Sequence, residues 1–239
     1  MKIKGSTAFV TGANRGLGLA YAKALLAAGA IKVYASARDP SSVTLDGVVP
    51  IKLDVTNADD IAAAAAQCSD VDLLINNAGI TVRGEALLSD LGVDSLRLLM
   101  ETNVYGVLAV SRAFAPVLAR NGGGVLVNML SVLSWISLPG TSIYPVTKAA
   151  AWVVTNGLRN ELSRQGTLVV GVHAGLIETD MIKGIGNATL PRSRPEDIAK
   201  AVMKGIEAGD SEVIADDTSR NVKAGFGKTP AAYLATSAQ

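Results

Sequence analysis

Thr7-Ala8-Phe9-Val10-Thr11-Gly12-Ala13-Asn14-Arg15-Gly16-Leu17-Gly18 is the stretch that decides the fold. Its first four residues are apolar and β-rich, which predicts a short buried strand that ends in a glycine-rich turn. A helical pattern follows from Leu19 to Ala28 and stops at Gly29, and Lys32–Ala37 then predicts a second strand. Strand, glycine-rich turn, helix and strand form the opening of a doubly wound α/β fold.

The three glycines of the turn each have a physical task if the turn binds a dinucleotide. Gly12 permits a tight turn, Gly16 lets the backbone approach a pyrophosphate, and Gly18 lets the helix pack closely on the strand. The free N–H groups at the start of the helix would then point at the anion. The spacing T-G-x-x-x-G-x-G differs from the more common G-x-G-x-x-G, and taken alone it leaves a plain turn as the alternative.

The rest of the chain alternates apolar strands with helices, which predicts a parallel sheet with helices on both faces. The expected strands are Val49–Leu53, Asp72–Ile75, Gly124–Met129, Leu168–Val172 and Glu212–Ala215. The expected helices are Ala58–Gln67 capped by Asn57, Leu96–Arg120 bent at Pro116, Tyr144–Arg164 with Pro145 in its first turn, and Pro195–Ala208. No linker or repeat divides the chain, so we expect residues 1–239 to form a single Rossmann-like α/β domain. The tail after Asp217 carries no assigned element.

The composition argues against several classes of protein. The chain is 49% hydrophobic and 18% charged with a mean hydropathy of +0.33, which is ample material for a core. A net charge of +1 without a basic run gives no indication of nucleic acid or an anionic membrane. Cys68 is the only cysteine, no signal-peptide pattern is present, and no apolar run reaches the ~18 residues of a membrane span. We therefore expect a cytoplasmic protein, and the absence of a His/Cys/Asp cluster with ligand spacing predicts no catalytic metal.

Tyr144 and Lys148 are the candidate proton-transfer pair. Four residues apart in a helix, their side chains lie on one face. The pKa of a free tyrosine, about 10, is too high for efficient proton exchange at pH 7, and a neighbouring ammonium group lowers it. The same spacing also occurs by chance on many helix faces, so the pair alone does not decide the function.

Five motifs in one order resemble the short-chain dehydrogenase/reductase family, in its single-domain form. They are the glycine turn, Asn76-Asn77-Ala78-Gly79, Asn103, Ser131, and the Tyr144/Lys148 pair, with Ser131 13 residues before Tyr144 as the family spacing requires. The resemblance extends from about Thr7 to Asp197.

This resemblance implies roles for four residues in catalysis. Tyr144 would be the general acid in reduction and the base in oxidation, while Lys148 would lower its pKa and bind the nicotinamide ribose. Ser131 would donate a hydrogen bond to the substrate oxygen. Asn103 would hold a water that links Lys148 to solvent. Two alternatives stay open: Ser134 is a nearby competitor of Ser131, and Asn103 could be a structural residue that kinks its helix.

The resemblance also implies a cofactor site assembled from several parts of the chain. Its expected residues are Gly12, Asn14, Arg15, Gly16, Leu17, Gly18, Arg38, Asp54, Val55, Asn77, Ala78, Gly79, Tyr144, Lys148, Ile177 and Thr179. The chain departs from the family where Ala174-Gly175 replaces the usual Pro-Gly, which affects the placement of the segment that follows.

Charge at the end of the second expected strand favours NADP(H) over NAD(H). NAD-specific sites carry an acid there, whereas an arginine accommodates the 2′-phosphate of NADP. Ala37 stands at the acid position, Arg38 follows it, and Arg15 would point at the same spot. Two guanidinium groups can bind a phosphate with charge-assisted hydrogen bonds. Asp39 is a contrary sign, and the alternative is that both arginines are solvated surface charges.

Apolar residues are expected around the substrate. Trp135 and Leu138 follow Ser131, and Leu176 and Met181 follow the sixth strand, which predicts a hydrophobic ketone or aldehyde reduced to the alcohol. Residues 180–194 are the expected substrate loop.

Two other functions compete with the reductase: a non-catalytic NADP(H)-binding regulatory module, and a lyase or epimerase that uses the cofactor transiently. His173, the only histidine, is expected to be a packed strand residue. A homodimer or homotetramer is expected through the helices Leu96–Arg120 and Tyr144–Arg164.

Overall fold

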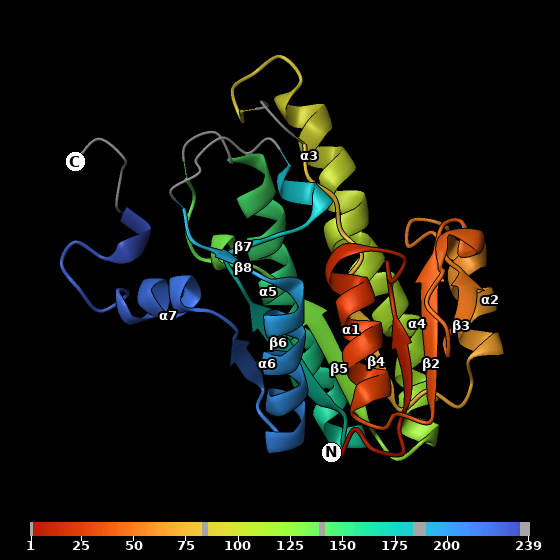
Figure 1. The fold of residues 1–239 in the computed structure, drawn as a ribbon. Helices are drawn as coiled ribbons and strands as arrows, with labels where there is room; N and C mark the ends of the chain where they lie inside the picture. Colours follow the sequence, from red (N-terminus) through yellow and green to blue (C-terminus); the bar gives the residue numbers. More distant parts are fainter. Residues whose placement is uncertain (1, 83–85, 139–141, 184–189, 235–239) are drawn as a thin grey trace.

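Seven parallel strands form the central sheet of the computed structural model, which describes residues 2–82, 86–138, 142–183 and 190–234 (Figure 1). The strand order is β3-β2-β1-β4-β5-β6-β9, and every neighbouring pair is parallel. The predicted doubly wound α/β domain is confirmed. The strands are β1 (Thr7–Val10), β2 (Lys32–Ala37), β3 (Val49–Lys52), β4 (Leu73–Asn76), β5 (Val125–Met129), β6 (Leu168–His173) and β9 (Glu212–Ile214). A separate parallel pair, β7 (Leu176–Ile177) and β8 (Arg192–Ser193), was not expected from the sequence.

Helices cover both faces of the sheet because successive strand residues point to opposite sides. In β1, Ala8 and Val10 pack in one core with the helices α1 (Gly16–Ala27) and α6 (Pro195–Ala208). Phe9, between them, packs in the second core. That core is formed with α2 (Ala58–Gln67), α4 (Val107–Arg120) and α5 (Ile143–Leu162) (Figure 1).

The long central helix differs from its prediction. It begins as α3 (Gly92–Met100) and continues as a π-helical segment, Glu101–Gly106, before α4 begins. A bend was expected at Pro116, but α4 runs through that proline and the irregular turn lies nearer the start. Gly106 fits there because a Cβ at this position would lie 2.9 Å from the backbone oxygen of Val55. π-helical turns are frequent at functional sites, and this one contains Asn103.

Two further helices differ from the sequence-based expectation: α1 begins earlier, and the tail contains a helix that was not expected. Helix α1 begins at Gly16 instead of Leu19, inside the glycine turn. The unassigned tail contains α7 (Asp217–Ala224), whose first turn is capped by the Asp216 carboxylate, which accepts from Ser219 N at 2.8 Å. Asp216 at the N-cap is a recognisable helix-start signal. Of the expected substrate loop, the structure describes a 3₁₀ turn at Asp180–Ile182 and β8, while residues 184–189 lie outside the described residues.

The helix Gly92–Arg120 is long and apolar enough to cross a membrane when only its length and composition are considered. Half of its most apolar window is buried against the rest of the protein, as in a core helix. No other stretch among the described residues meets the same criteria.

Candidate active site

Most of the expected cofactor residues, and Ser131, lie in segments that follow the carboxyl ends of the parallel strands, whereas Asn103, Tyr144 and Lys148 lie on helices. The order of strands reverses between β1 and β4, since β1 is followed on one side by β2 and β3 and on the other by β4 and β5. Ligands of doubly wound sheets bind in the crevice at this reversal. The glycine turn leaves β1 there and Asn77–Gly79 leaves β4, so the structure brings the two predicted cofactor segments together.

The glycine turn has the shape of a dinucleotide cradle. Gly12 and Gly16 have φ values of +63° and +56°, which favour glycine. A Cβ on Gly18 would lie 2.0 Å from the carbonyl oxygen of Gly12, so no side chain fits between the helix and the turn. Thr179 packs against Gly16, where a Cβ would lie 3.3 Å from the threonine methyl group. This cradle, with the N-terminus of α1 behind it, fits a pyrophosphate.

Thr11 joins the two cofactor segments, although the sequence analysis did not identify it. Its hydroxyl oxygen accepts hydrogen bonds from the backbone N–H groups of Asn77 and Ala78, both at 2.9 Å. In return, the Asn77 amide donates to the carbonyl oxygens of Thr11 at 2.9 Å and of Gly12 at 3.2 Å. The turn after β1 and the turn after β4 are therefore one hydrogen-bonded unit.

A buried polar chain lies directly behind this unit. The Asn76 amide donates to Ser111 on α4 and to Asn128 on β5, both at 2.9 Å. Asn128 in turn donates to the Thr155 hydroxyl on α5 at 3.0 Å. All four side chains are at least 97% buried. Satisfied buried networks of this kind fix one arrangement of strands and helices.

Ser131 is held at the start of a short 3₁₀ helix, Val132–Ser134, which follows β5. Its hydroxyl oxygen accepts from Leu133 N at 3.1 Å and lies 3.5 Å from the carbonyl oxygen of Ala174. The Ser134 hydroxyl accepts from Ser131 N at 3.2 Å, which completes a capping box. Both hydroxyls therefore belong to one capping box, and the assignment of Ser131 to the substrate oxygen stays a prediction.

Asn103 is 99% buried and ties the π-helical turn to its surroundings. Its oxygen accepts from Ile80 N, and its nitrogen donates to Ile80 O, both at 2.9 Å. The same nitrogen donates to the Thr147 hydroxyl on α5 at 3.1 Å. A Cβ on Gly79 would lie 3.2 Å from Asn103 Oδ1 and 3.9 Å from Lys148 Nζ, so both side chains flank the same glycine.

Lys148 is 95% buried on α5, and its ammonium donates to the carbonyl oxygen of Met129 at 2.8 Å. Its Nζ lies 5.6 Å from the centre of the Tyr144 ring. Burial lowers the pKa of Lys148 to about 8. Burial also raises the pKa of the Tyr144 phenol. The largest influence on the phenol is thus desolvation, which opposes the lowering expected from the nearby ammonium.

The two arginines expected at the 2′-phosphate are both exposed. Arg15 lies 3.5 Å from the Asp180 carboxylate, and Arg38 directly follows the end of β2. Asp39, the acidic residue that argued for NAD(H), forms hydrogen bonds within its own turn. Its carboxylate accepts from Ser41 N at 2.9 Å and from Ser41 Oγ at 2.7 Å. These hydrogen bonds lower the pKa of Asp39 and make it the cap of a 3₁₀ turn.

The remaining predicted residues are spread around the same edge. Asp54 accepts from Thr56 N at 2.9 Å, and Val55 packs against Gly106. Ile177 lies on β7, where its carbonyl oxygen accepts from the Thr179 hydroxyl at 3.3 Å. Asn14 is half-buried in the turn and Leu17 is buried in α1.

The four predicted substrate residues do not share one environment. Leu138 and Met181 are exposed, at 40% and 37%, and Leu176 is half-buried on β7. Trp135 instead stacks on the His173 ring at a centroid distance of 3.9 Å and meets Phe226 edge-on at 5.5 Å. The indole therefore packs into an aromatic cluster, and its contact with a substrate stays a prediction.

Fold and site together define a dinucleotide-binding oxidoreductase. The chain belongs to the short-chain dehydrogenase family, whose model, described as short chain dehydrogenase, matches residues 6–189. It is 33% identical to the 2-(R)-hydroxypropyl-CoM dehydrogenase of Xanthobacter autotrophicus, covering 87% of this chain and 88% of that protein. It is 29% identical to the NADP-dependent 3-hydroxy acid dehydrogenase of Schizosaccharomyces pombe, covering 90% and 92%. A short chain dehydrogenase from Burkholderia cenocepacia, solved in complex with NADP, is similar with a TM-score of 0.89, 37% identity and 96% coverage of each chain.

Proposed function

We propose that the protein is an NADP(H)-dependent carbonyl reductase or alcohol dehydrogenase that acts on a hydrophobic ketone or aldehyde. The observation that carries the proposal is the joint position of Tyr144, Lys148 and Ser131 beside the glycine cradle. Lys148 contacts the end of β5 through Met129, and Ser131 begins the turn that follows the same strand. These contacts support the proposal that a proton donor and a hydrogen-bond donor lie next to the nicotinamide ring.

NADP(H) is the cofactor that the charges of the cleft support. Arg38 follows β2, Arg15 is exposed in the glycine turn, and the Asp39 carboxylate accepts a hydrogen bond from Ser41. The NADP-dependent dehydrogenase of S. pombe and the NADP complex of the B. cenocepacia dehydrogenase agree with this preference. When bound, the dinucleotide supplies or accepts the hydride.

The chain's own residues hold and move the proton. In reduction, the Tyr144 phenol donates its proton to the carbonyl oxygen, while the Ser131 hydroxyl donates a hydrogen bond to the same oxygen. Burial keeps the phenol protonated in the free protein, which is the form that an acid needs. As the phenolate forms, the adjacent Lys148 ammonium favours it electrostatically. In alcohol oxidation the same groups act in reverse.

The Asn103 amide and the two turns of the cradle orient these groups. Asn103 connects the segment after β4 to Thr147 on α5, three residues from Tyr144. The Thr147 hydroxyl donates to the carbonyl oxygen of Tyr144 at 2.8 Å, so the catalytic turn of α5 is fixed from both sides.

The substrate class rests on the apolar residues near the site. Leu138 and Met181 expose part of their side chains, and Leu176 lies on β7 close to the expected nicotinamide segment. A hydrophobic carbonyl compound fits these side chains better than an anionic one. The substrates of two relatives, the 3-hydroxy acid dehydrogenase of S. pombe and the 2-(R)-hydroxypropyl-CoM dehydrogenase of X. autotrophicus, are the alternatives that a substrate panel must include.

We further propose a cytoplasmic homodimer or homotetramer. The long helices expected to associate expose apolar side chains: Leu98 is 55% exposed, Tyr105 53% and Leu108 40%, and on α5 Val153 is 64% exposed. Contiguous exposed apolar surface is typical of protein interfaces. Sedimentation of the purified protein, with Leu98→Glu as the variant expected to dissociate it, tests this part of the proposal.

The test of the function is oxidation of NADPH, measured as the loss of absorbance of the reduced nicotinamide. The panel contains aryl ketones, aliphatic ketones, aldehydes, 3-keto acids and the ketone that corresponds to 2-(R)-hydroxypropyl-CoM. Tyr144→Phe is measured beside the parent, and NADPH binding to both is measured by fluorescence. We expect turnover of apolar ketones that is lost in Tyr144→Phe while NADPH affinity is kept. NADPH binding without turnover of any carbonyl compound would move the assignment to a regulatory module.

A further inference from the structure

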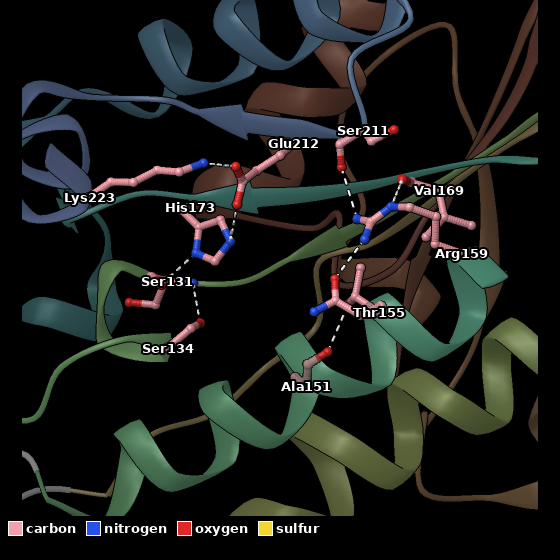
Figure 2. Close-up of polar contacts among 11 residues, drawn as sticks. Ser131, Ser134, Ala151, Thr155, Arg159, Val169, His173, Ser211, Glu212 and Lys223 are labelled. Carbon is pink, nitrogen blue, oxygen red and sulfur yellow. Dashed lines mark hydrogen bonds and ion pairs between the residues drawn. The ribbon is translucent and has the colours of Figure 1, made fainter. Parts of the chain in front are cut away.

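His173 links the predicted catalytic Ser131 to a cluster of charged residues at the edge of the sheet (Figure 2). It ends β6, is fully buried, and its Nδ1 lies 3.0 Å from the backbone oxygen of Ser131. On the opposite side of the ring, Nε2 lies 3.6 Å from Glu212 Oε1. The other oxygen of Glu212 is paired with the ammonium of Lys223 on α7.

The geometry determines which nitrogen of the ring carries the proton. The Ser131 carbonyl oxygen can only accept, so a 3.0 Å contact requires an N–H on Nδ1. Burial lowers the pKa of His173 to about 4, so at neutral pH the ring holds one proton. Nε2 is then a bare acceptor, and it has no hydrogen-bond partner among the described residues, since Glu212 presents another acceptor.

The charges around the ring oppose one another. Glu212 favours the protonated ring, whereas Lys223 and the buried Lys148 disfavour it. Trp135 covers one face of the ring, stacked at 3.9 Å, and Trp152 meets it edge-on at 6.3 Å. A cavity of about 260 Å³ lies beside the ring and is lined by Trp152, Asn156, Arg159, Gly171, His173, Ser211 and Glu212.

His173 contacts the backbone carbonyl oxygen of the residue that carries the hydroxyl. The Ser131 carbonyl oxygen accepts from both Ser134 N, at 3.0 Å, and His173 Nδ1. The first of these bonds belongs to the 3₁₀ turn and would persist in any turn of this shape. The second is the side-chain anchor that attaches this carbonyl to β6, beside the backbone bond from Val132 N to Ala174 O at 2.8 Å.

We infer that His173, as the neutral Nδ1–H tautomer, is a positioning residue that holds Ser131 in the orientation its hydroxyl needs. The inference rests on the proposed function, in which Ser131 binds the substrate oxygen. His173 itself does not contact the substrate in this proposal; it keeps the Ser131 hydroxyl in the position from which it can. Small displacements of a positioned group cost about 100-fold in rate.

Nuclear magnetic resonance of the imidazole nitrogens tests the tautomer without any activity. Because the chain contains a single histidine, ¹⁵N-labelled protein gives one pair of ring nitrogen signals. We expect a protonated Nδ1 and an unprotonated Nε2 at pH 7. A ring protonated on Nε2, the tautomer favoured in free histidine, would overturn the inference because Nδ1 could not then bond Ser131.

Three substitutions separate the hydrogen bond from the packing of the ring. In His173→Asn the amide N–H stands near the place of Nδ1 and can still donate to Ser131, although the stack on Trp135 is lost. In His173→Phe the stack is kept and the donor is lost. In His173→Gln the amide reaches toward Glu212 in place of Ser131.

We expect kcat to fall about 10- to 100-fold in His173→Phe and His173→Gln, with the KM for NADPH little changed. His173→Asn should keep most of the kcat despite a lower melting temperature. Glu212→Gln is the matched control on the far side of the ring and should leave kcat close to that of the parent. Rates that follow melting temperature across the set would show a merely structural role and overturn the inference.

Ser131→Ala distinguishes the two possible failures. If Ser131→Ala keeps full activity, the proposed function of Ser131 is wrong whatever the state of His173. If Ser131→Ala is inactive and His173→Phe is as active as the parent, the proposed function stands and the positioning role of His173 is wrong.

Discussion

The side chain of Asn103 forms two hydrogen bonds with the backbone of one residue, Ile80, accepting from its N–H and donating to its carbonyl oxygen, both at 2.9 Å. The amide thus satisfies both backbone groups of Ile80, as a neighbouring strand would do, in the segment that follows β4. Its remaining hydrogen bond reaches Thr147 on α5. One buried amide thus connects the cofactor segment, the π-helical turn and the catalytic helix.

Asn103→Asp should therefore lower both stability and activity. A carboxylate cannot donate to Ile80 O or to the Thr147 hydroxyl, and each buried group left unsatisfied costs about 1–3 kcal/mol. We expect the free energy of unfolding to fall by roughly 2–5 kcal/mol in urea titrations. Asn160→Asp is the matched control because Asn160 is exposed on α5. Equal losses in the two variants would contradict the structural role assigned to Asn103.

Gly18 should tolerate no side chain, unlike Gly157. In Gly18→Ala the new Cβ would lie 2.0 Å from the carbonyl oxygen of Gly12, so the turn must open and the cradle is lost. We expect NADPH binding to be abolished in calorimetric titrations, together with destabilisation of about 1–3 kcal/mol or more.

The same substitution in α5 is the control for Gly18. A Cβ at Gly157 meets nothing within 4 Å, so Gly157→Ala should bind NADPH normally. It should also be stabilised by up to about 1 kcal/mol, because alanine favours a helix more than glycine does. Retained NADPH binding in Gly18→Ala would refute the cradle.

Arg38→Ala should weaken the use of NADPH and leave the use of NADH nearly unchanged. A hydrogen bond from a guanidinium to a phosphate contributes about 1.5–3 kcal/mol, which corresponds to a roughly 10- to 100-fold loss in kcat/KM with NADPH. Steady-state kinetics with both cofactors measures the ratio. Arg120→Ala, an exposed arginine in the last turn of α4, is the control and should not change it. A parallel loss with both cofactors would mean that Arg38 does not distinguish the 2′-phosphate.

The sheet could be predicted from the sequence because strands such as Leu73–Asn76 and Val125–Met129 are buried on both faces, which gives short apolar runs between helices. The order of motifs along the chain was also sufficient to bring Asn103, Ser131, Tyr144 and Lys148 toward one edge. Each of these residues follows or faces the carboxyl end of a strand. In a doubly wound sheet, the order of strands and helices along the chain is enough to predict this.

Three features depend on contacts between distant residues, and sequence patterns did not predict them. The π-helical turn is one. It ends at Gly106, where a side chain would collide with Val55, a residue far away in the sequence. The pairing of β7 with β8 is another, since two-residue strands carry no periodicity. The third is the stack of the Trp135 ring on His173, which joins the segment after β5 to the end of β6.

The burial of Lys148 predicts how stability changes in alkaline solution. Its pKa is about 8 in the folded protein against 10.5 for the free side chain. Between these values the unfolded chain binds more protons than the folded protein, so this group makes the free energy of unfolding rise as pH increases. Below pH 8 its burial cost is fully present, and it amounts to at most about 3 kcal/mol. Lys148→Met removes the titration and keeps much of the volume.

The measurement is urea unfolding of the parent and of Lys148→Met, without cofactor, from pH 7 to pH 9.5. We expect the variant to be more stable than the parent at pH 7 and the difference between them to shrink steadily above pH 8. The comparison isolates Lys148 because both proteins share the opposing effect of Cys68, whose pKa burial raises from 9.0 to about 12. A difference that stays constant over this range would show that Lys148 titrates normally in the folded protein, and the ammonium would then be fully charged throughout the pH range in which the enzyme is expected to work.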